Sequence, residues 1–372
     1  MKKLFIFSIL SLLLYSCDNV DDVYTYGEEP EIDWNAAANR STDVLISQFW
    51  NNEGYFNYGS NNSNTEFQYW PNAHAMDVVI DAYVRTNDSK YKAYFDKWYA
   101  GIKMKNGGSY YNNFYDDMQW NALTILRLYN VTKEDKYLTT VKELWIDIAK
   151  GWNDYADGGL AWKKDMIYSK NACSNGPASL LAARLYNLTK EDSYKEWAMK
   201  IYEWQKNTLY NRSTGAVYDN INGETNVLDE TSLTYNQGTF VGTAVELYHI
   251  TGDEVYLNDA QKASNYTISK LIDTSNNILR NEGNGDNALF KGIFIRYFYT
   301  LIQIPELNNS YKTKFITFFN NNAVTLWTSG CYQDYLLFGP AWNEPPVGNS
   351  QLTAQASACM TIEAKALFSK AN

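Results

Sequence analysis

A short pattern that recurs four times constrains the fold of this sequence more than any other feature. Each copy reads Tyr-x-x-Thr-x-acid-x-x-Tyr, where the acid is Asp or Glu. The copies begin at Tyr83, Tyr129, Tyr186 and Tyr248, so they lie 46, 57 and 62 residues apart. Repeats of this length indicate stacked helical units. Because an apolar helical stretch precedes and follows each Thr, we expect every copy to join two antiparallel helices.

The Thr and the acid of each joint are residue types that begin helices. A Thr side chain can accept a bond from the unpaired N–H groups of the following helix, and an acid in its first turn favours the helix dipole. We therefore expect each Thr to cap the second helix of its hairpin. Three joints also have the spacing of a capping box, at Thr132–Asp135, Thr189–Asp192 and Thr251–Glu254.

The pattern predicts an all-α fold of six helical hairpins. Helices are expected upstream of the four joints at 73–84, 118–130, 177–187 and 237–249, and two weaker units follow near 287–302 and 352–368. Hairpins of similar size can form an open solenoid or a closed ring. We favour closure into an (α/α)6 barrel with six inner and six outer helices. Alternating β-branched runs, which would indicate strands, are nearly absent.

The N-terminal segment has the pattern of an export signal. Lys2 and Lys3 precede an apolar run at 4–14, which is too short to span a membrane. The following Leu-Tyr-Ser-Cys resembles a bacterial lipobox, so we expect a signal peptide at 1–16 and lipidation of Cys17. Residues 17–33 are then an acidic tether, and 34–372 a single catalytic domain. This predicts an outer-membrane lipoprotein, exposed at the cell surface or on the periplasmic face; the alternative is an ordinary signal with a chance cysteine.

Composition argues against several classes of protein. A formal net charge of -10 is unfavourable for binding nucleic acid. The sequence has 2 His and no Cys-x-x-Cys, so we expect neither a metal site nor a cofactor. If Cys17 is acylated, an odd set of three cysteines remains, which favours buried thiols over disulfides: Cys173, Cys331 and Cys359. No oligomer interface is evident, and we expect a monomer.

The segments directly before the expected inner helices are rich in polar and aromatic residues. If the inner helices are parallel, these segments meet at one mouth of the ring, where a binding site is expected. The long connections 151–176 and 211–236 enter the same face. The five segments are 70–72, 114–117, 171–176, 233–238 and 281–286.

Asp116 and Asp117 are the strongest candidates for chemistry in these segments. Two adjacent carboxylates repel each other, so one resists ionisation, while a helix N-terminus helps the other stay charged. One acid and one carboxylate are what glycoside hydrolysis requires, and neighbouring residues suit the separation of roughly 5 Å of a retaining enzyme. The structural alternative is a helix cap with a dipole partner.

The sequence around this pair resembles glycoside hydrolase family 76, the endo-α-1,6-mannanases. The signature is Tyr-Asp-Asp-Met-Gln-Trp-Asn-Ala-Leu at 115–123. Further matches follow in the family's order and cover about residues 35–365: 69–70 with 73–75, 170–172 with 175–176, 234–238, and 290–294 with 296–297. The resemblance implies an (α/α)6 barrel, a retaining mechanism, and α-1,6-mannan as polysaccharide or oligosaccharide substrate. It also implies Asp116 as nucleophile and Asp117 as general acid/base. Pro177 and the two residues after it depart from the bulkier residues usual there.

The remaining polar and aromatic residues of the mouth are candidate sugar contacts. The amides of Asn171, Asn175, Asn236 and Gln237 both donate and accept, which matches vicinal hydroxyls, although Asn is also routine in turns. Trp70, Trp120 and Tyr235 are candidate stacking platforms, and Trp120 suits core packing equally. His74 is expected either to bind a sugar or to complete a core network.

Other charged groups have structural interpretations. Lys291 and Arg296 are expected to pair with acids. Segments 219–224 and 283–286 faintly resemble calcium loops but lack the full spacing, so we interpret them as solvated turns. Two other functions stay open: a non-catalytic glycan-binding surface lipoprotein, or another (α/α)6 enzyme such as an inverting hydrolase, an epimerase or a lyase. The scarcity of His argues against the last two.

Overall fold

The computed structural model describes residues 31–371. Residues from Trp34 onward form one compact unit. The expected signal peptide, Cys17 and most of the expected tether lie outside the described residues, so the division of the chain stays a prediction. No helix within 31–371 combines the length and the apolar character that crossing a membrane requires.

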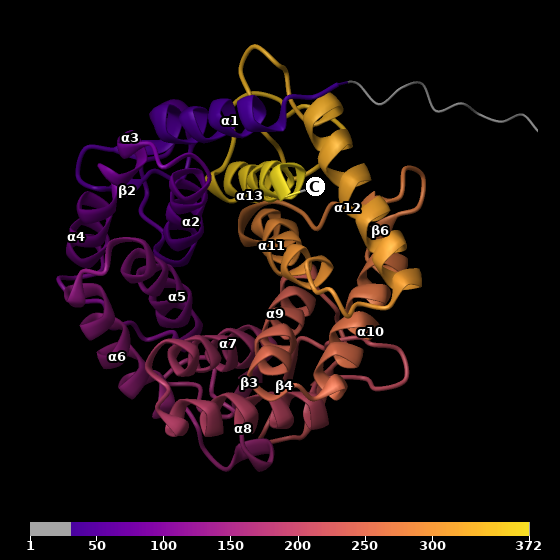
Figure 1. The fold of residues 1–372 in the computed structure, drawn as a ribbon. Coiled ribbons are helices and arrows are strands. Elements are labelled where there is room, and N and C mark those ends of the chain that lie inside the picture. The colour runs from indigo at the N-terminus through magenta and orange to yellow at the C-terminus, as the bar shows by residue number, and fades with distance from the viewer. Residues whose placement is uncertain (1–30, 372) are drawn as a thin grey trace, which may run out of the picture. The chain divides into compact units, whose positions relative to one another are not determined.

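Six inner helices follow one another around a ring. Each contacts the next in chain order, and the last contacts the first, which closes the ring (Figure 1). These helices are buried around most of their circumference because neighbours flank them on both sides and an outer helix covers them. They are α2 (Tyr69–Thr86), α5 (Tyr115–Thr132), α7 (Ala172–Thr189), α9 (Thr234–Thr251), α11 (Phe290–Ile302) and α13 (Leu352–Ala371).

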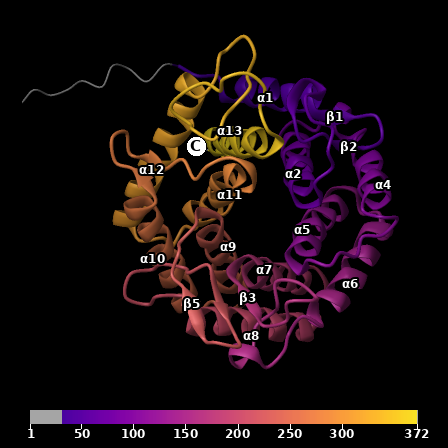
Figure 2. The same cartoon turned by 180° about the vertical axis from the view of Figure 1, so that it is seen from behind.

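Outer helices surround this ring, and the view from behind has the same order (Figure 2). They are α1 (Trp34–Phe49), α4 (Phe95–Lys105), α6 (Asp135–Ala149), α8 (Asp192–Thr208), α10 (Glu254–Lys270) and α12 (Asn309–Ser329), with the single turn α3 (Ser89–Lys92) before α4. The sixth pair differs from a simple hairpin. α13 packs against α1, so the two ends of the described chain together complete the ring.

Strands are short and confined to connections within the described residues. Two antiparallel pairs are β1 (Trp50–Asn51) with β2 (Tyr55–Phe56), and β6 (Ile272–Asp273) with β7 (Ile278–Leu279). A third sheet orders β3 (Ser169–Asn171), β4 (Asn220–Asn222) and β5 (Val227–Asp229). Its β3–β4 pairing joins the two long connections predicted at the mouth. Single 3-10 turns are η1 (Ser60–Asn62), η2 (Tyr155–Asp157) and η3 (Gly285–Leu289).

The joints occur where the repeat predicts them, but their capping is different. Thr132 is the last residue of α5 rather than a cap of α6: its hydroxyl donates to Leu128 O at 2.8 Å and accepts from Glu134 N at 3.2 Å. Lys133 between them adopts a left-handed conformation that ends the helix. The acid is the residue that precedes the next helix, as at Asp253, whose carboxylate accepts from Val255 N. The capping-box prediction is therefore wrong.

Close approach of two inner helices near the closure of the ring depends on Gly292. Its N–H donates to Ser357 Oγ of α13 at 2.9 Å, and a Cβ there would lie 2.5 Å from Ser357 Cα. Because that neighbour is backbone, the clash is relieved only by moving a helix. We expect Gly292→Ala to lower the free energy of unfolding by about 1–3 kcal/mol. Chemical denaturation measures this loss. Ser329→Ala on α12 is a suitable control, whereas Gly252→Ala is not, because the φ of Gly252 is positive.

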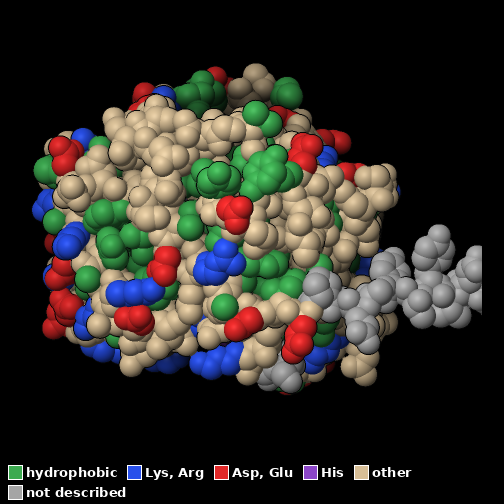
Figure 3. Space-filling view, turned by 90° about the horizontal axis from the view of Figure 1, so that it is seen from above, with side chains coloured by type: hydrophobic (Ala, Val, Ile, Leu, Met, Phe, Trp, Pro, Cys, Tyr) green, Lys and Arg blue, Asp and Glu red, His purple; other side chains and the backbone are tan. Residues whose placement is uncertain are grey.

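All three cysteines of the described chain are free and buried, as expected: Cys173, Cys331 and Cys359. One face of the protein has acidic and basic side chains interspersed (Figure 3).

Candidate active site

A cavity of about 490 Å³ lies where the inner helices begin, as the sequence predicts for the mouth of the ring. Five inner helices or the residues just before them contribute to its wall. The long connections add Trp162 and Asp219. The lining residues are Trp70, Phe114, Asp116, Asp117, Trp120, Trp162, Asn171, Cys173, Asp219, Tyr235, Asp286 and Phe290.

Asp116 is held by two side-chain donors. Its Oδ2 accepts from Trp162 Nε1 at 3.2 Å and from Cys173 Sγ at 3.4 Å. Burial raises the pKa of Asp116 to about 6, while Cys173, the backbone N–H of Asp117 and Trp162 oppose that rise by binding the charged form. Its Oδ1 is buried and has no hydrogen-bond partner among the described residues. A carboxylate held at one oxygen and unpartnered at the other is suited to attack a reacting atom.

Asp117 has a different environment from its neighbour. Burial, then the adjacent Asp116, then Asp286 raise its pKa well above the ordinary range. Among the described residues, no side-chain donor offsets this rise by binding the charged form of Asp117. The pair is therefore expected to ionise first at Asp116 and to keep its proton at Asp117, although the two carboxyls titrate as one coupled system.

Aromatic rings form the walls of the cavity. Trp70, Trp120 and Tyr235, the three predicted stacking platforms, all line it. Tyr235 lies flat on Phe290, with ring centroids 3.8 Å apart. Trp120 is only 3 % exposed, so it packs in the core and presents one edge of its surface to the cavity. Trp162 was not predicted, although it lies in a connection expected at this mouth.

The predicted amide contacts divide into two groups. Asn171 lines the cavity. Asn175 is fully buried: its Oδ1 accepts from Leu160 N at 2.8 Å, and its Nδ2 donates to Leu160 O and Asn171 O. It fixes the connection 151–176 to α7 and has no surface for a sugar. The prediction of a sugar contact at Asn175 is wrong because a loop carbonyl and amide satisfy its side chain.

Asn236 and Gln237 also lie behind the wall rather than on it. Both are fully buried. Asn236 Nδ2 donates to Asp219 Oδ1 at 2.9 Å, and Gln237 Nε2 donates to Val217 O at 3.2 Å. The geometry therefore gives them a supporting function: they fix the connection that carries Asp219, and direct contact with a sugar is not supported.

His74 lies beneath the cavity between two indoles. It is 2 % exposed, and its ring centroid lies 5.5 Å from that of Trp70 and 4.8 Å from that of Trp120. Burial lowers its pKa to about 3, so the imidazole is neutral. Neither nitrogen has a hydrogen-bond partner among the described residues. His74 therefore packs against the two indoles, and the predicted core network is not formed among the described residues. A contact between His74 and a sugar stays a prediction.

Asp219 and Asp286 are the main residues that the sequence did not identify. Both lie in segments that we interpreted as solvated turns, yet both line the cavity. Asp286 Oδ1 accepts from Trp70 Nε1 at 3.1 Å. Asp219 accepts from the amides of Asn236 and Asn220 at 2.9 and 3.0 Å. Turn chemistry alone gave no signal of this, because the direction of a loop side chain depends on how the connections fold over the ring.

Of the two basic residues expected to pair with acids, one forms an ion pair and the other does not. Arg296 pairs with Asp81 at 2.6 Å, as expected. Lys291 forms no ion pair with any described residue: its Nζ donates to Pro340 O at 2.6 Å and lies 4.5 Å from the ring centroid of Trp342. Burial lowers the pKa of Lys291 to about 7. The expected direct ion pair is therefore absent among the described residues, although the charge of Glu282 still acts on Lys291 and opposes the lowering of its pKa.

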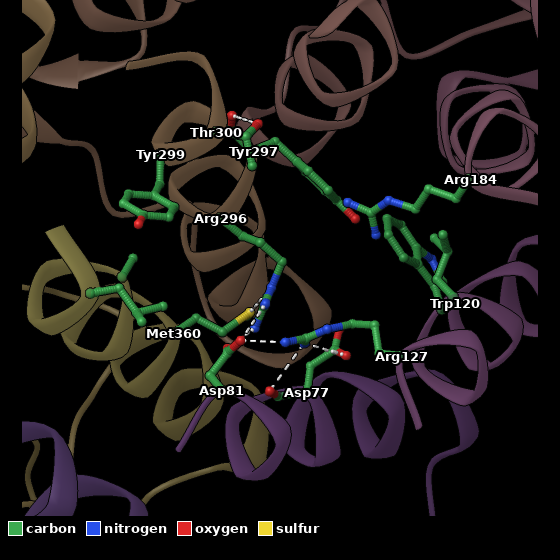
Figure 4. Close-up of a pocket in the computed structure, with 13 residues that line it drawn as sticks. Asp77, Asp81, Trp120, Arg127, Arg184, Arg296, Tyr297, Tyr299, Thr300 and Met360 are labelled. Carbon is green, nitrogen blue, oxygen red and sulfur yellow. Dashed lines mark hydrogen bonds and ion pairs between the residues drawn. The ribbon is translucent and has the colours of Figure 1, made fainter. Parts of the chain in front are cut away.

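A second chamber of about 200 Å³ lies on the other side of Trp120, which lines both cavities. Figure 4 shows Asp77 and Asp81 of α2 facing Arg127 and Arg296. Arg127 donates to Asp77 Oδ1 at 2.7 Å and also binds Asp81. Burial is the largest single influence and raises the pKa of Asp77, but Arg127, Arg296 and His74 together outweigh it, and the pKa lies below its ordinary value. The charges of this chamber are thus neutralised in place.

Two neighbouring carboxyls, one held by donors and the other with its pKa raised well above the ordinary range, line an aromatic-walled cavity. This arrangement defines the class of carboxylate-pair glycoside hydrolases. No group of three or more His, Cys, Asp or Glu side chains within residues 31–371 is arranged to hold a metal ion.

The chain belongs to glycosyl hydrolase family 76, whose family model matches residues 33–372. Among curated relatives, mannan endo-1,6-alpha-mannosidase DCW1 of Saccharomyces cerevisiae is 28% identical over 214 residues, 51% of this chain and 45% of that protein. The protein of the same name from Candida glabrata is 25% identical over 292 residues, 69% of this chain and 63% of that protein. The chain thus spans less than two thirds of the length of these relatives.

Solved structures are similar over more of their length. The alpha-1,6-mannanase GH76A of Salegentibacter sp. HEL1_6 has a TM-score of 0.87 and 39% identity, covering 90% of this chain and 99% of that one. An inactive variant of that mannanase, with two consecutive aspartates replaced by alanine, is a complex with alpha-1,6-mannotetrose. The Lin0763 protein of Listeria innocua has a TM-score of 0.85 and 36% identity, covering 92% of this chain and 99% of that one.

Proposed function

We propose that this protein is a retaining, endo-acting glycoside hydrolase that cleaves α-1,6-mannosidic linkages in mannan. The observation that carries the proposal is the unequal pair at the start of α5: the Asp116 carboxyl accepts from two side-chain donors, and among the described residues the Asp117 carboxyl accepts from none, so the pKa of Asp117 is raised further. Family membership supports it, as does the inactive Salegentibacter mannanase with two consecutive substituted aspartates. Within the described residues of this chain, Asp-Asp occurs at 116–117 alone.

The proposed fold is an (α/α)6 barrel. The contacts of the inner helices in chain order and the closing contact of α13 with α2 support it. A barrel of this kind brings the starts of five inner helices to one mouth. A long substrate can then reach Asp116 and Asp117 through that mouth.

In the proposed mechanism, Asp117 donates its proton to the leaving glycosidic oxygen while ionised Asp116 attacks C1. The C1–O bond breaks as the bond from C1 to Asp116 forms, and the leaving chain departs with the proton. Asp117, now a base, deprotonates a water that displaces Asp116 from C1. Trp70 and Tyr235 offer apolar ring surface to the sugar, and the Asn171 side chain offers polar contacts. Trp120 contributes only the small part of its ring that reaches the cavity.

The pKa values of the pair predict a bell-shaped pH dependence. Turnover is expected to fall as the pH drops through about 6, because Asp116 takes up a proton and loses its charge. It is expected to fall again at alkaline pH, where Asp117 loses the proton that it must donate. Initial rates across the pH range check this. A rate that stays constant between about pH 4 and pH 7 contradicts the assignment of Asp116.

Linear α-1,6-mannan is the decisive substrate. We expect early products of several sizes on chromatography, and anomer-resolved NMR of the first products should report the α-anomer because two displacements retain configuration. An initial β-anomer would instead identify an inverting enzyme. Binding of mannan without release of reducing ends would identify a glycan-capture protein.

We also propose that the protein is a surface-exposed outer-membrane lipoprotein, anchored through Cys17 and an acidic tether. The basic residues, the short apolar run and the lipobox-like sequence at its end support this. Labelling with a radioactive fatty acid in a bacterial host should modify the wild-type chain and fail for Cys17→Ala. Equal labelling of both chains would contradict the proposal, and protease treatment of intact cells distinguishes the surface from the periplasmic face.

A further inference from the structure

Four carboxyls share the catalytic cavity, and two of them have no function in the proposed mechanism. Asp116 and Asp117 perform the reaction, whereas Asp219 and Asp286 approach from other elements. No Lys or Arg lines the cavity, and the ion pairs found among the described residues include none of these four carboxyls. The partners of Asp219 and Asp286 are neutral: two amides and one indole.

Elsewhere in residues 31–371 the chain pairs its buried acids with cations. The acid side chains of these pairs are at most 20% exposed, and a paired cation is how proteins usually compensate such burial. Examples are Asp77–Arg127, Asp81–Arg296, Glu246–Arg184, Asp259–Lys206 and Glu363–Arg85. The catalytic cavity departs from this practice at Asp219, which is half-buried and has no cation, and Asp286 adds a second unpaired carboxylate at the exposed rim.

An uncompensated charge in a cleft with low-dielectric walls extends its field across the whole cleft. Rings such as Trp70, Tyr235 and Phe290 supply such walls here. An uncharged sugar enters without electrostatic cost, and the positive charge that develops at C1 is favoured. A glycan that carries a negative group must approach carboxylates that have no counter-cation, and that repulsion weakens its binding.

We propose that Asp219 and Asp286 are specificity-determining residues, whose unpaired carboxylates select uncharged mannan and reject glycans that carry a negative group near the scissile bond. This inference rests on the proposed function and defines its substrate class. Asp286 is the better residue to test. It lies exposed at the rim, and its side chain's contact with Trp70 can be kept by an amide oxygen.

Other titratable groups near the pair do not account for such selection. Tyr69 of α2, Cys173 of α7 and Tyr235 of α9 all have pKa values raised chiefly by burial, so they are neutral near pH 7. The pKa values of Asp219 and Asp286 are also raised by burial, and hydrogen bonds from their neutral partners oppose the rise. The charge of the cavity at neutral pH therefore belongs to its aspartates.

The test compares two forms of α-1,6-linked mannotetraose. One carries a phosphate monoester on a hydroxyl outside the linkages, and the other carries the dimethyl ester of that phosphate, which has similar bulk and no charge. We expect the wild-type kcat/KM for the monoester to be lower by about tenfold or more at low salt. The ratio of kcat/KM for the dimethyl ester to kcat/KM for the monoester should shrink by about threefold or more in Asp286→Asn. It should shrink similarly for the wild type at about 0.5 M salt, because salt screens the field of the carboxylates.

Glu203→Gln is the matched control, because it removes one acid from an exposed position of the outer helix α8. It should leave the ratio unchanged. Equal wild-type values for both esters, or a ratio insensitive to both Asp286→Asn and salt, would overturn the inference. Failure to cleave unmodified mannotetraose would count against the proposed function instead, and calorimetric binding of the two esters would still test the selection.

Discussion

Replacing Asp116 by Asn is expected to lower kcat on α-1,6-mannan by at least about 10³-fold. The amide keeps the size of the side chain and can still accept from Trp162 Nε1, but it is no nucleophile. The melting temperature should stay the same or rise slightly, because the neutral amide removes a buried charge that no cation compensates. Steady-state assays and thermal unfolding measure the two effects.

Asp117→Asn should lose turnover for a different reason. Without a proton donor, departure of a sugar leaving group slows by about 10²–10⁴-fold. An activated aryl α-1,6-mannobioside needs little protonation of its leaving group, so its glycosylation step should be affected much less. No such recovery is expected for Asp116→Asn. The exposed Asp334→Asn serves as control, and near-wild-type activity of either catalytic variant on mannan would end the assignment.

Arg85→Met is expected to lower the free energy of unfolding by about 3–5 kcal/mol. Arg85 of α2 binds Glu363 of α13 through two hydrogen bonds of 2.7 and 3.0 Å, and the two side chains are 1% and 0% exposed. Thr42 of α1 donates to the same carboxylate at 2.8 Å. The network therefore ties three helices where the chain ends meet. Removing the arginine leaves a buried carboxylate without its cation.

The double substitution Arg85→Met with Glu363→Met distinguishes the contribution of the intact ion pair from the cost of leaving one charge unpaired. Because both charges then leave the interior, we expect it to recover most of the stability that the single change loses. The surface pair Lys142–Glu191 is the control, since its side chains are 38% and 50% exposed. Lys142→Met should cost less than about 1 kcal/mol. Denaturant unfolding of all variants checks this, and a loss at Arg85 no larger than at Lys142 would refute it.

Much of the helical framework could be predicted, because its signals are local. The repeated joint marks where one helix ends and the next begins, and this depends on residues within a few positions of Thr132 and its counterparts. Details of capping were wrong for an equally local reason. A Thr can bond back to its own helix or forward to the next, and Lys133 in a left-handed conformation favours the first.

The functions of single polar residues were harder to predict. Asn171 and Asn175 lie one helical turn apart and looked equivalent, yet one lines the cavity and the other binds Leu160 behind it. The difference arises from the connection 151–176, which folds over α7 and covers Asn175. Composition and spacing carry no information about which amide a distant loop will cover.

Periodicity and short motifs act over a few residues, so they were enough to predict the helical hairpins, the mouth at which their starts meet, and the pair Asp116–Asp117. Folding in three dimensions was needed to show that α1 completes the last hairpin with α13, and that Asp219 and Asp286 share the catalytic cavity. The physical reason is that these features depend on contacts between segments far apart in the chain. Such contacts, and the burial that alters the pKa of each carboxyl, exist only once the ring has closed.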